Sequence, residues 1–358
     1  MSARLRVVLD QLVHVVDADQ ASASLDLAAG LVATSPAGCD VEAIAPAGAS
    51  VSIRGLAGVR TLPLARRELA ASWQLGLTPG VGGGLIHSAT LMAPLVRHDR
   101  VHDNDQTTVT LWDLQAWEAP ETLSKSAVVW QRAMLKRAVK YADAVVVPSH
   151  AMAERLAELK PKLGERIRVI AGAAPEGFAV PDDADARRSE LSLPSRYVAL
   201  CGDADSLETG FRGAIAAGLD AVVLDAPEGA EPRLSEVAVA AGLPEHRVHV
   251  RGVLSVEDRA AALGGASAYV ATSTRSAWPW RVVEAMTLGV PVVAAESGVH
   301  RDVIADGGAI VPVADLPDAV ADAVGAGGVR LRVLGEDRSR AFSWMGSAER
   351  VWGLHADL

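Results

Sequence analysis

The sequence predicts an α/β fold built from two doubly wound domains with parallel sheets. Three observations carry this prediction. Residues 271–312 read as strand, loop, helix, strand, helix and strand, which is half of such a domain. Short apolar runs alternate with helical segments through both halves of the chain. Finally, 358 residues exceed one ordinary core, and about two domains are expected at this length.

The first half supplies the elements of one parallel sheet. Residues 5–9 form a buried-strand candidate, and an alanine-rich helix is expected over 22–34. Further apolar runs predict strands, with helices between them, at residues 41–44, 84–87, 107–112, 144–147 and 167–170.

The second half repeats this alternation after a break in the pattern. Residues 171–196 are rich in Ala, Pro and Asp without a period, which is typical of a linker. A strand is predicted at 197–201, and a final helix at about 347–354. The predicted division is a first domain over 1–172, a linker over 173–196, a second domain over 197–340 and a C-terminal helix within 341–358.

Composition limits the function classes. The formal net charge of −10 argues against a general nucleic-acid binder, because such proteins usually carry a basic face. Two distant cysteines, Cys39 and Cys201, fit a reducing compartment without a disulfide framework. The apolar start is broken by Asp10 and His14, and no run of about 18 apolar residues occurs. We therefore expect a cytoplasmic protein without a membrane span.

The turn over 273–280 is the predicted ligand site. In doubly wound domains, ligands bind outside the carboxyl ends of the parallel strands. Residues 281–289 have helical spacing with a glycine stop, and Glu284 lies just inside this helix.

At these residues the sequence resembles a known family. The segment VVEAMTLGVPVVAAESGVHRDVIADGGAIVP is similar to the donor-binding half of family-4 retaining glycosyltransferases of the GT-B fold. The similarity continues through FSWMGSAERVWGLHADL, and through HSATLMAPL, WDLQAWEAPETL and ADAVVVPSHAMAERLAEL in the first half. The resemblance implies two facing Rossmann-like domains with a cleft between them. The first would bind the acceptor, the second a nucleotide sugar, and the last helix would cross back to the first.

The resemblance assigns the donor side residue by residue. Two glutamates mark the family, and the second matches Glu284, which would contact the ribose. The alternative for Glu284 is an exposed helix residue paired with Arg281 at three-residue spacing. The first glutamate is replaced by Ser276, which by this resemblance would lie near the donor sugar. Trp278 stands where the family has an aromatic residue between glycines, and Pro279 replaces a glycine.

The predicted diphosphate contacts are sparse. After residues 197–201 the family carries a glycine followed by basic residues. Gly202 matches that glycine, but no basic residue lies between it and Phe211. Asp203, Asp205 and Glu208 instead add negative charge, which repels a diphosphate. Arg275, Arg212 or Arg251 would have to supply the missing positive charge; the alternative for residues 202–211 is an ordinary solvated turn.

The acceptor side is also altered. Residues 17–24 contain no glycine where the family has a glycine-rich loop. Trp112 replaces the family histidine that follows the predicted strand over residues 107–111, and an indole cannot exchange a proton near neutral pH. Asp113 and His87 match the family, although a strand-end histidine is also common as a structural residue. Trp112, Trp117, Trp278 and Trp280 are expected either in packing or in the cleft, against a sugar.

Two charged segments stand apart from this site. His98, Asp99, His102, Asp103 and Asp105 have no known metal-motif spacing and read as an exposed loop, so no metal or other cofactor is expected. Residues 125–141 form a basic helix that either covers the sheet or docks on anionic lipid beside a lipid-linked acceptor. Its cations are Lys125, Arg132, Lys136, Arg137 and Lys140.

Two functions follow from the sequence. The first is a retaining glycosyltransferase of surface glycan or glycolipid assembly, using a nucleotide sugar. The second is a degenerate, inactive member of the family that serves as partner or scaffold of an active transferase. The losses at the site favour the second, whereas the resemblance favours the first.

Overall fold

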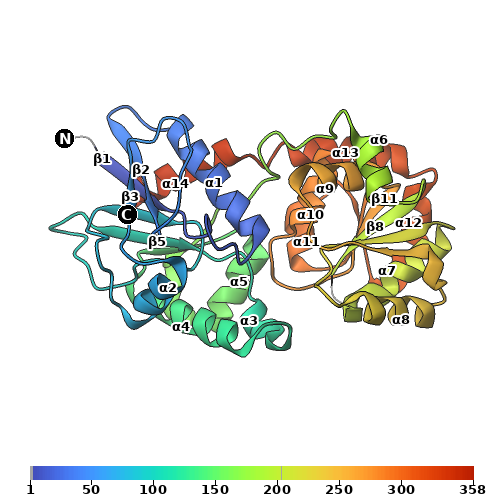
Figure 1. The fold of residues 1–358 in the computed structure, drawn as a ribbon, viewed down its shortest axis with the longest axis horizontal. Coiled ribbons are helices and arrows are strands. Elements are labelled where there is room, and N and C mark those ends of the chain that lie inside the picture. The colour runs from blue at the N-terminus through green and yellow to red at the C-terminus, as the bar shows by residue number, and fades with distance from the viewer. Residues whose placement is uncertain (1–2, 203) are drawn as a thin grey trace. The chain divides into compact units, whose positions relative to one another are not determined.

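The computed structural model describes residues 3–202 and 204–358 and divides the chain into two compact units. The first unit comprises Met1–Gly172, Ser276–Trp278 and Ser343–Leu358. The second comprises Ala173–Arg275 and Pro279–Phe342. Each unit is an α/β layer structure with its own parallel sheet (Figure 1).

The first unit contains a sheet with strand order β3-β2-β1-β4-β5-β6-β7, and all its pairs are parallel. The order reverses between β1 and β4, so this is the point where a doubly wound sheet binds ligands. The strands are β1 Ala3–Val8, β2 Cys39–Ala45, β3 Gly58–Thr61, β4 Leu85–Ser88, β5 Gln106–Thr110, β6 Ala144–Val147 and β7 Ile167–Val169.

Helices α1 and α14 pack against each other in this unit, and α2, α3 and α4 form a second group (Figure 1). The helices are α1 Ala18–Ala33, α2 Arg66–Leu75, α3 Gln115–Glu118, η1 Pro120–Thr122, α4 Lys125–Tyr141, α5 His150–Leu159, η2 Pro161–Arg166 and α14 Trp344–Asp357.

The last helix, α14, is an integral part of the first unit. Gly30 of α1 allows close approach, because a Cβ there would lie 2.8 Å from the Trp344 carbonyl oxygen. The indole N–H of Trp352 donates to the Leu31 carbonyl at 3.1 Å, and the Ser347 hydroxyl donates to the Ala171 carbonyl at 2.7 Å. The final 16 residues thus complete the core of the unit that the first 172 residues build.

The second unit repeats the topology, with strand order β10-β9-β8-β11-β12-β13 and parallel pairs throughout. Its order reverses between β8 and β11, again the position expected for ligand binding. The strands are β8 Tyr197–Cys201, β9 Asp220–Leu224, β10 Val248–Val250, β11 Ala268–Ala271, β12 Val292–Ala295 and β13 Ala309–Val311.

A buried apolar cluster joins this sheet to α7, α8 and α12, while α6, α9, α10 and α13 form a second packed group. The helices are α6 Ala184–Glu190, α7 Ala204–Ala216, α8 Glu231–Ala241, η3 Glu245–Arg247, α9 Val256–Gly264, α10 Trp280–Thr287, α11 Gly298–Ile304, η4 Val313–Asp315, α12 Leu316–Val324 and α13 Gly328–Ser339.

The segment predicted as a linker, residues 173–196, belongs to the second unit instead. It contains α6, whose Ala184 is buried and which packs on α9. Arg187 pairs with Asp258 at 2.8 Å, and Arg188 donates to the Ala261 carbonyl at 3.1 Å. The lack of sequence period misled the prediction, because a helix of two turns shows little periodicity and is held here by tertiary bonds.

Other elements differ from the prediction in their limits: β5 ends at Thr110 rather than at residue 112, and α14 spans Trp344–Asp357 rather than 347–354. Strand β3 was missed, because it is short, carries Arg60 and is mostly exposed at the edge of the sheet. Helix α1 begins at Ala18 rather than near Ser22, since the Asp17 side chain caps it by accepting from the Gln20 amide. Among the described residues, no helix is long and apolar enough to span a membrane.

Candidate functional site

The glutamate predicted to contact ribose, Glu284, is buried in the second unit, with 1% of its surface exposed. Arg259 Nε donates to its Oε2 at 3.0 Å, and Arg259 Nη2 donates to its Oε1 at 2.9 Å. Arg281 Nη1 donates to the same Oε1 at 3.0 Å. The predicted pairing with Arg281 is present, but the predicted exposure is not. A second arginine, unnoticed in the sequence, forms the larger part of the contact.

This ion-pair cluster extends to the ends of β8 and β9. Arg281 Nε donates to Asp225 Oδ2 at 2.6 Å, and the Cys201 thiol donates to the same oxygen at 3.4 Å. Arg259 and Arg281 are 3% and 6% exposed. Buried charges of this kind are tolerated only when they are paired and hydrogen-bonded, so the four charges form one compensated group.

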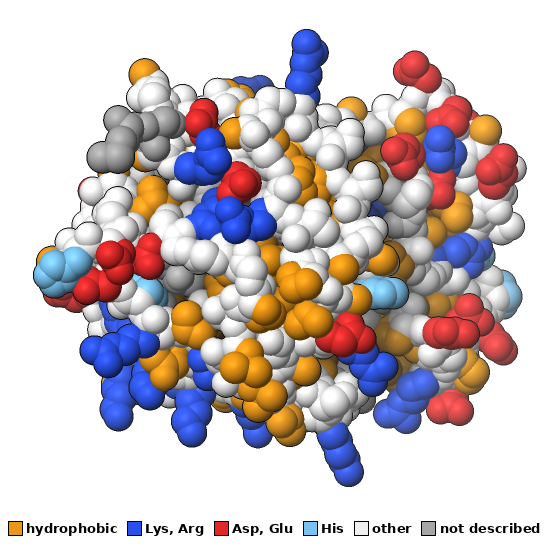
Figure 2. Space-filling view, turned by 60° about the vertical axis from the view of Figure 1, so that its left-hand side comes forward, with side chains coloured by type: hydrophobic (Ala, Val, Ile, Leu, Met, Phe, Trp, Pro, Cys, Tyr) orange, Lys and Arg blue, Asp and Glu red, His pale blue; other side chains and the backbone are white. Residues whose placement is uncertain are grey.

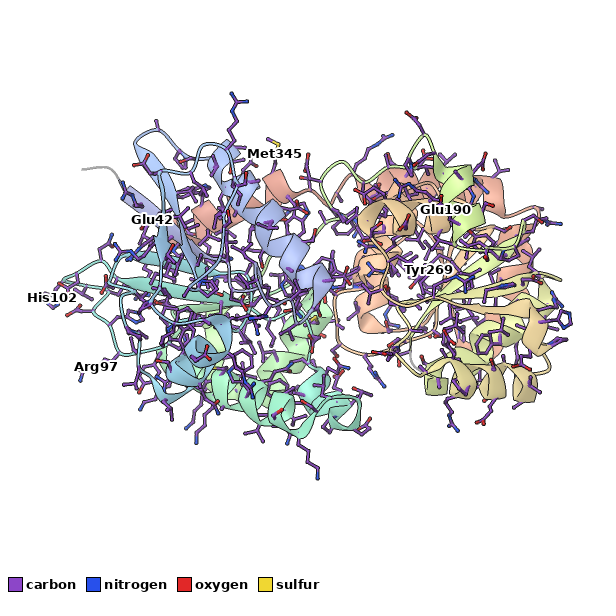
Figure 3. All side chains as sticks on the ribbon, viewed as in Figure 1. Glu42, Arg97, His102, Glu190, Tyr269 and Met345 are labelled. Atoms are coloured by element: carbon purple, nitrogen blue, oxygen red, sulfur yellow. The ribbon has the colours of Figure 1, made fainter. Side chains whose placement is uncertain are left out.

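Tyr269 of β11 borders this cluster in the interior of the second unit (Figure 3). Burial raises the pKa of its phenol well above the usual range, with a smaller contribution from the nearby Cys201. The phenol therefore remains neutral and adds no charge to the group formed by Arg259, Glu284, Arg281 and Asp225.

Two polar atoms at the carboxyl ends of these strands have no hydrogen-bond partner among the described residues. They are Asp225 Oδ1, after β9, and Thr272 Oγ1, after β11. Thr272 is only 8% exposed. Buried polar atoms are nearly always satisfied, so an unsatisfied pair beside the reversal point of the sheet indicates a place for a polar group from outside.

The region expected to hold a diphosphate offers few available cations. Glu208 pairs with Arg212, and Arg251 donates to the Leu191 carbonyl at 2.7 Å. Arg275 lies half-buried, with its amide 3.5 Å from the Ser273 hydroxyl oxygen. Of the predicted acidic residues here, Asp203 and the side chain of Asp205 lie outside the described part of the chain.

Gly202 is present for a local reason. Its φ of 152° is a conformation that side chains rarely adopt, and a Cβ would lie 2.8 Å from the Ser206 hydroxyl oxygen. The glycine therefore fits the turn between β8 and α7, independently of any ligand.

Residues 276–278, predicted on the donor side, are grouped with the first unit. The amide and hydroxyl of Ser276 both donate to the Glu118 carboxylate at 2.8 Å. Ala277 forms an antiparallel bridge with Asp113, and the Trp278 amide donates to the Trp112 carbonyl at 2.8 Å. The hydroxyl that stands in the place of the family's first glutamate is thus committed to an internal contact.

Trp112 and Trp278 are packing residues of the first unit, 5% and 3% exposed. The Trp112 indole N–H donates to the Ala89 carbonyl at 2.7 Å, and its ring meets Trp344 edge to face with centroids 6.3 Å apart. Both indoles lie against Gly172, where any Cβ would be 3.0 Å or less from them. Trp112 therefore provides neither an available N–H nor a proton.

His87 lies in the interior, away from the cavity that Asp113 lines. Its Nδ1 is 2.8 Å from the Thr108 hydroxyl oxygen, which is 3.2 Å from His355 Nε2. His355 Nδ1 is 2.7 Å from Gln106 Oε1. Burial lowers the pKa of His87 to about 3 and that of His355 to about 4. Both rings are neutral at neutral pH and connect α14 to the sheet, which matches the structural alternative for His87.

A cavity of about 170 Å³ lies at the carboxyl ends of β1, β4 and β5, the reversal point of the first sheet. Asp17 and Asp113 line it, together with amide side chains of Gln20 and Gln131. Burial raises the pKa of Asp17 to about 6 and also raises the pKa of Asp113. Of the residues predicted on the acceptor side, Trp112 and Asp113 line this cavity and His87 does not.

Side-chain oxygens accept from two amides just before α1 and from one amide of its first turn, next to this cavity. Gln11 Oε1 accepts from the Val16 and Asp17 amides, each at 2.9 Å, and Asp17 Oδ1 accepts from the Gln20 amide at 2.9 Å. A helix N-terminus otherwise favours anions such as phosphate. Side chains replace that anion here, in the loop where the family's glycines are missing.

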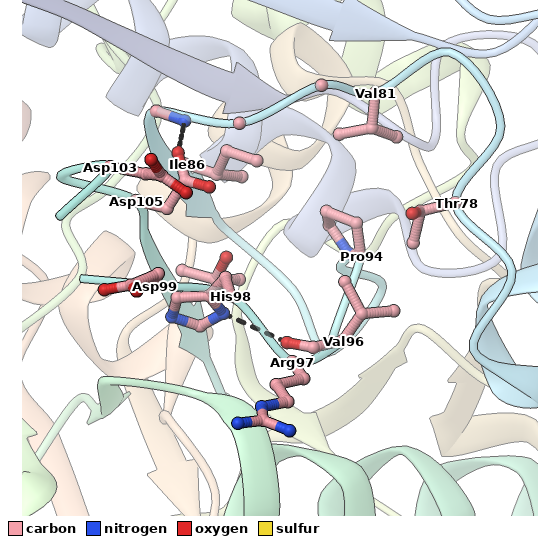
Figure 4. A pocket seen from close by; sticks show the side chains of 14 residues that line it. Thr78, Val81, Ile86, Pro94, Val96, Arg97, His98, Asp99, Asp103 and Asp105 are labelled. Carbon is pink, nitrogen blue, oxygen red and sulfur yellow. Dashed lines mark hydrogen bonds between the residues drawn. The ribbon is translucent and has the colours of Figure 1, made fainter. Parts of the chain in front are cut away.

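The acidic loop after β4 lines a different cavity of about 460 Å³ (Figure 4). Asp105 accepts from the Gly84 amide, and His98 lies between the Val96 carbonyl, 3.0 Å away, and Asp143, 2.8 Å away. The hydrogen bond that the His98 ring donates to the Asp143 carboxylate raises the pKa of His98. In the described residues, no three His, Cys, Asp or Glu side chains are arranged to hold a metal ion.

The predicted basic helix is α4, and its five cations fall into two groups. Arg132 donates to the Ala116 carbonyl at 2.7 and 3.0 Å, and Arg137 donates to the Leu95 carbonyl. Lys125, Lys136 and Lys140 are exposed, and Val129 between them is 62% exposed. The two arginines thus hold α4 on its own unit, and the lysines face solvent.

Comparison with known proteins places this geometry in the class of GT-B glycosyltransferases by fold. A family model described as "Glycosyl transferases group 1" matches residues 215–326, all of which except 276–278 belong to the second unit. A comparison with curated protein sequences gives no match. The protein is therefore glycosyltransferase-like in its second unit by sequence, and in both units by fold.

Solved structures similar to this chain include several glycosyltransferases. HepE of Anabaena, determined with UDP and glucose, has a TM-score of 0.68 and 16% identity, covering 99% of this chain and 100% of its own. Sucrose-phosphate synthase of Thermosynechococcus elongatus has a TM-score of 0.70 and 19% identity, and the match covers 99% of this chain and 98% of that one. WaaG, a glycosyltransferase involved in lipopolysaccharide biosynthesis, has a TM-score of 0.64 and 12% identity, and the match covers 97% of this chain and 98% of that one. Two Rossmann-like domains with parallel sheets are the shared feature.

Proposed function

We propose that this protein is an inactive glycosyltransferase-like chain that serves as partner of an active transferase. One observation carries the proposal. The Glu284 carboxylate, 1% exposed, already accepts hydrogen bonds from three N–H groups, two of Arg259 and one of Arg281. A ribose would have to displace charge-assisted bonds that its neutral hydroxyls cannot equal in strength.

Other residues support the loss of transfer chemistry. Pro279 caps the start of α10 and has no amide N–H to offer a phosphate. Ser276 is bound to Glu118, and Trp112 holds the place of a histidine without an exchangeable proton. Preorganised donors at the leaving diphosphate supply much of the rate in such reactions, so their absence removes catalysis directly.

The second candidate is a retaining transferase that moves a sugar from a nucleotide sugar to a surface glycan or glycolipid. The unsatisfied Asp225 Oδ1 and Thr272 Oγ1 favour it, because a bound polar ligand would satisfy both atoms. Glu284 would then exchange part of its arginine contacts for the ribose when the nucleotide binds.

Thermal shift and calorimetry of the whole chain separate the two candidates. The panel comprises UDP, GDP, ADP, UDP-glucose and GDP-mannose, each at about 1 mM. A dissociation constant below about 0.1 mM would stabilise the fold by about 1.4 kcal/mol at that concentration. We expect no shift and no heat. Binding by any of them, lost in Glu284→Gln but kept in Glu296→Gln at an exposed position, would establish the transferase instead.

We also propose a peripheral contact with the inner face of a membrane through Lys125, Lys136 and Lys140, in a cytoplasmic protein. Figure 2 shows Lys and Arg side chains along the lower margin of one face, below a group of hydrophobic side chains. Each lysine near an anionic surface contributes about 1 kcal/mol. Replacing all three by Gln should release the chain from anionic vesicles at low salt. Equal partitioning of variant and parent would refute this contact.

A further inference from the structure

His98 lines two cavities of the first unit, near the residues where β4 and β5 begin. One is the cavity of about 460 Å³ that the acidic loop borders (Figure 4). The other has a volume of about 530 Å³ and lies beside the C-terminal end of α4. Residues 96–99 line both cavities and so form a shared wall. We call residues 97–104 the latch loop.

Both ring nitrogens of His98 face oxygen atoms that accept hydrogen bonds and cannot donate them. Nδ1 is 3.0 Å from the Val96 carbonyl oxygen, and Nε2 is 2.8 Å from Oδ2 of the Asp143 carboxylate (Figure 4 shows the first contact). A neutral imidazole has one N–H and satisfies one acceptor, whereas an imidazolium has two. His355, by contrast, faces a hydroxyl and a side-chain amide, which contain donors as well as acceptors. The contacts of His98 therefore require the doubly protonated ring.

Asp143 is ionised in this contact. Burial raises the pKa of its carboxyl, but hydrogen bonds from His98 and from the Thr107 amide, 2.7 Å from Oδ2, bring that pKa below its ordinary value. The same bond to Asp143 raises the pKa of His98, and burial of the ring opposes it. The two side chains are 14% and 12% exposed, so water screens their attraction only in part.

The remaining charges near His98 nearly cancel. The other ionisable side chains that line the two cavities include four cations and three carboxylates. They are Arg97, Asp99, Arg100, Asp103, Asp105, Lys140, Tyr141 and Arg166. His102 belongs to the same loop but lines neither cavity, and it pairs with Asp99 at 2.8 Å. The direct pair with Asp143, rather than the wider field, thus controls the protonation of His98.

The latch loop has few other polar attachments. Asp99 accepts from the amides two, three and six residues further on, so these bonds lie within the loop or at its end. Across the described residues 97–104, the polar contacts that reach beyond the neighbouring residues go to Asp143. They come from His98 Nε2 at 2.8 Å and from Arg100 Nη1 at 4.0 Å. Val101 is 82% exposed, so apolar burial does not hold the loop.

We propose that His98 is a proton-dependent latch, which as an imidazolium holds residues 97–104 on Asp143 and, on losing one proton to solvent above neutral pH, releases this loop and the wall shared by the two cavities. The neutral ring keeps one N–H and no charge, so it cannot satisfy both oxygens. Because the pKa of the held ring is raised, the closed loop is favoured below pH 6.5 and weakens as pH rises through the raised value. The inference concerns the first unit alone and holds for either function proposed above.

The titration of His98 is the first test. Histidine-selective isotope labelling of the whole chain gives each ring a signal in NMR spectra, and the signal lost in His98→Gln is that of His98. We expect its midpoint above the ordinary value of 6.5, and a lower midpoint in Asp143→Asn, which removes the negative charge. A midpoint at or below 6.5 in the parent would overturn the proposal.

Trypsin cleavage after Arg100 is the second test, because it reports release of the loop. The rate in His98→Gln, divided by the rate in the parent, cancels the pH dependence of trypsin itself. We expect a ratio of about tenfold at about pH 6, the scale of one charge-assisted hydrogen bond. The ratio should approach one at about pH 9, where the parent has also lost its latch. Mass spectrometry of the peptides that end at Arg100 gives both rates.

His102→Gln is the matched control, on the same loop but outside both linings, and should behave as the parent does. A ratio for His98→Gln that is the same at both pH values, or an equal increase in His102→Gln, would contradict the latch. Circular dichroism and melting temperature establish that each variant is folded. Should His98→Gln fail to fold, the parent is compared with a synthetic peptide of residues 94–106. Its rate relative to the peptide should rise about tenfold over the same pH range, and a constant relative rate would refute the proposal.

Discussion

The carboxyl edges of the two sheets have the same strand order at their reversal points but different chemistry. In the first unit, Asp17 and Asp113 line a cavity, and burial raises both carboxyl pKa values. In the second unit, Glu284 and Asp225 pair with Arg259 and Arg281 in the interior. In the first unit the arginine beside the cavity, Arg66, pairs with Asp10, and Asp17 and Asp113 line open space; in the second unit the arginines pair with the carboxylates themselves. The same fold thus leaves the carboxyl edge of the first sheet open, which we call the receptive edge. Ion pairs occupy the carboxyl edge of the second sheet, which we call the filled edge.

Breaking the filled edge should have the largest effect. Glu284→Ala leaves Arg259 and Arg281 buried with their shared carboxylate removed, and loss of one partner of a buried ion pair costs about 3–5 kcal/mol. Chemical denaturation should show this loss. Glu296→Ala, at an exposed pair with Arg301, should change the free energy of unfolding by less than about 0.5 kcal/mol. Similar small losses in both variants would mean that the cluster is open to solvent.

The first unit depends on α14, and Gly30 tests that dependence. Gly30→Ala would place a Cβ 2.8 Å from the Trp344 carbonyl oxygen, so α1 and α14 must move apart. Overpacking of this kind costs about 1–3 kcal/mol, against a gain of up to about 1 kcal/mol in helix propensity. Gly353→Ala, on α14 with no atom within 4 Å of the new Cβ, should be neutral or stabilising. Equal melting temperatures would show that the helices have room.

Acid should weaken the contact of α14 with the sheet. The folded pKa of His355, about 4, lies below the ordinary value of 6.5, so the unfolded state binds more protons as pH falls. Stability from this group is present above pH 6.5 and declines below it, by about 1.5 kcal/mol between pH 6.5 and 5.

The raised pKa of Asp17, about 6, means that the folded state binds more protons at this residue as pH falls, which increases stability over the same pH range. A comparison of variants is therefore needed to isolate the effect of His355. His355→Gln should remove about 1.5 kcal/mol from the acid-dependent loss between pH 6.5 and 5, measured by urea denaturation at each pH. The exposed His14→Gln should leave the pH dependence as in the parent. Identical profiles for parent and His355→Gln would show that His355 can be protonated without cost in the folded state.

The smallest effect concerns the receptive edge. Asp17→Ala removes the cap that accepts from the Gln20 amide and should cost about 1 kcal/mol, while Asp17→Asn keeps a capping oxygen without the buried charge and should not be destabilising. Thermal unfolding at pH 7 resolves the two. If Asn proves as costly as Ala, the Asp17 carboxylate has a role in the fold beyond the helix cap, and the edge is less receptive than its geometry indicates.

The sequence by itself determined the fold class and most strands, because alternating buried runs and helical spacing are local patterns. Strands β6 and β8 match their predicted limits, and the spacing of Arg281 and Glu284 predicted their pairing. The sequence also showed the departures from the family at Ser276, Pro279 and Trp112. Each of them removes a hydrogen-bond donor, a charge or an exchangeable proton, and the residue type alone is enough to recognise that loss.

Only the tertiary structure decided which groups meet. Arg259 lies 25 residues before Glu284 on another helix, and no spacing rule connects them. Ser276 was predicted beside the donor sugar, but its bonds go to Glu118, 158 residues away. The cavity lined by Asp17 and Asp113 likewise joins loops that follow β1, β4 and β5. Burial and charge pairing depend on what surrounds a side chain, and sheet order brings those surroundings from distant parts of the chain.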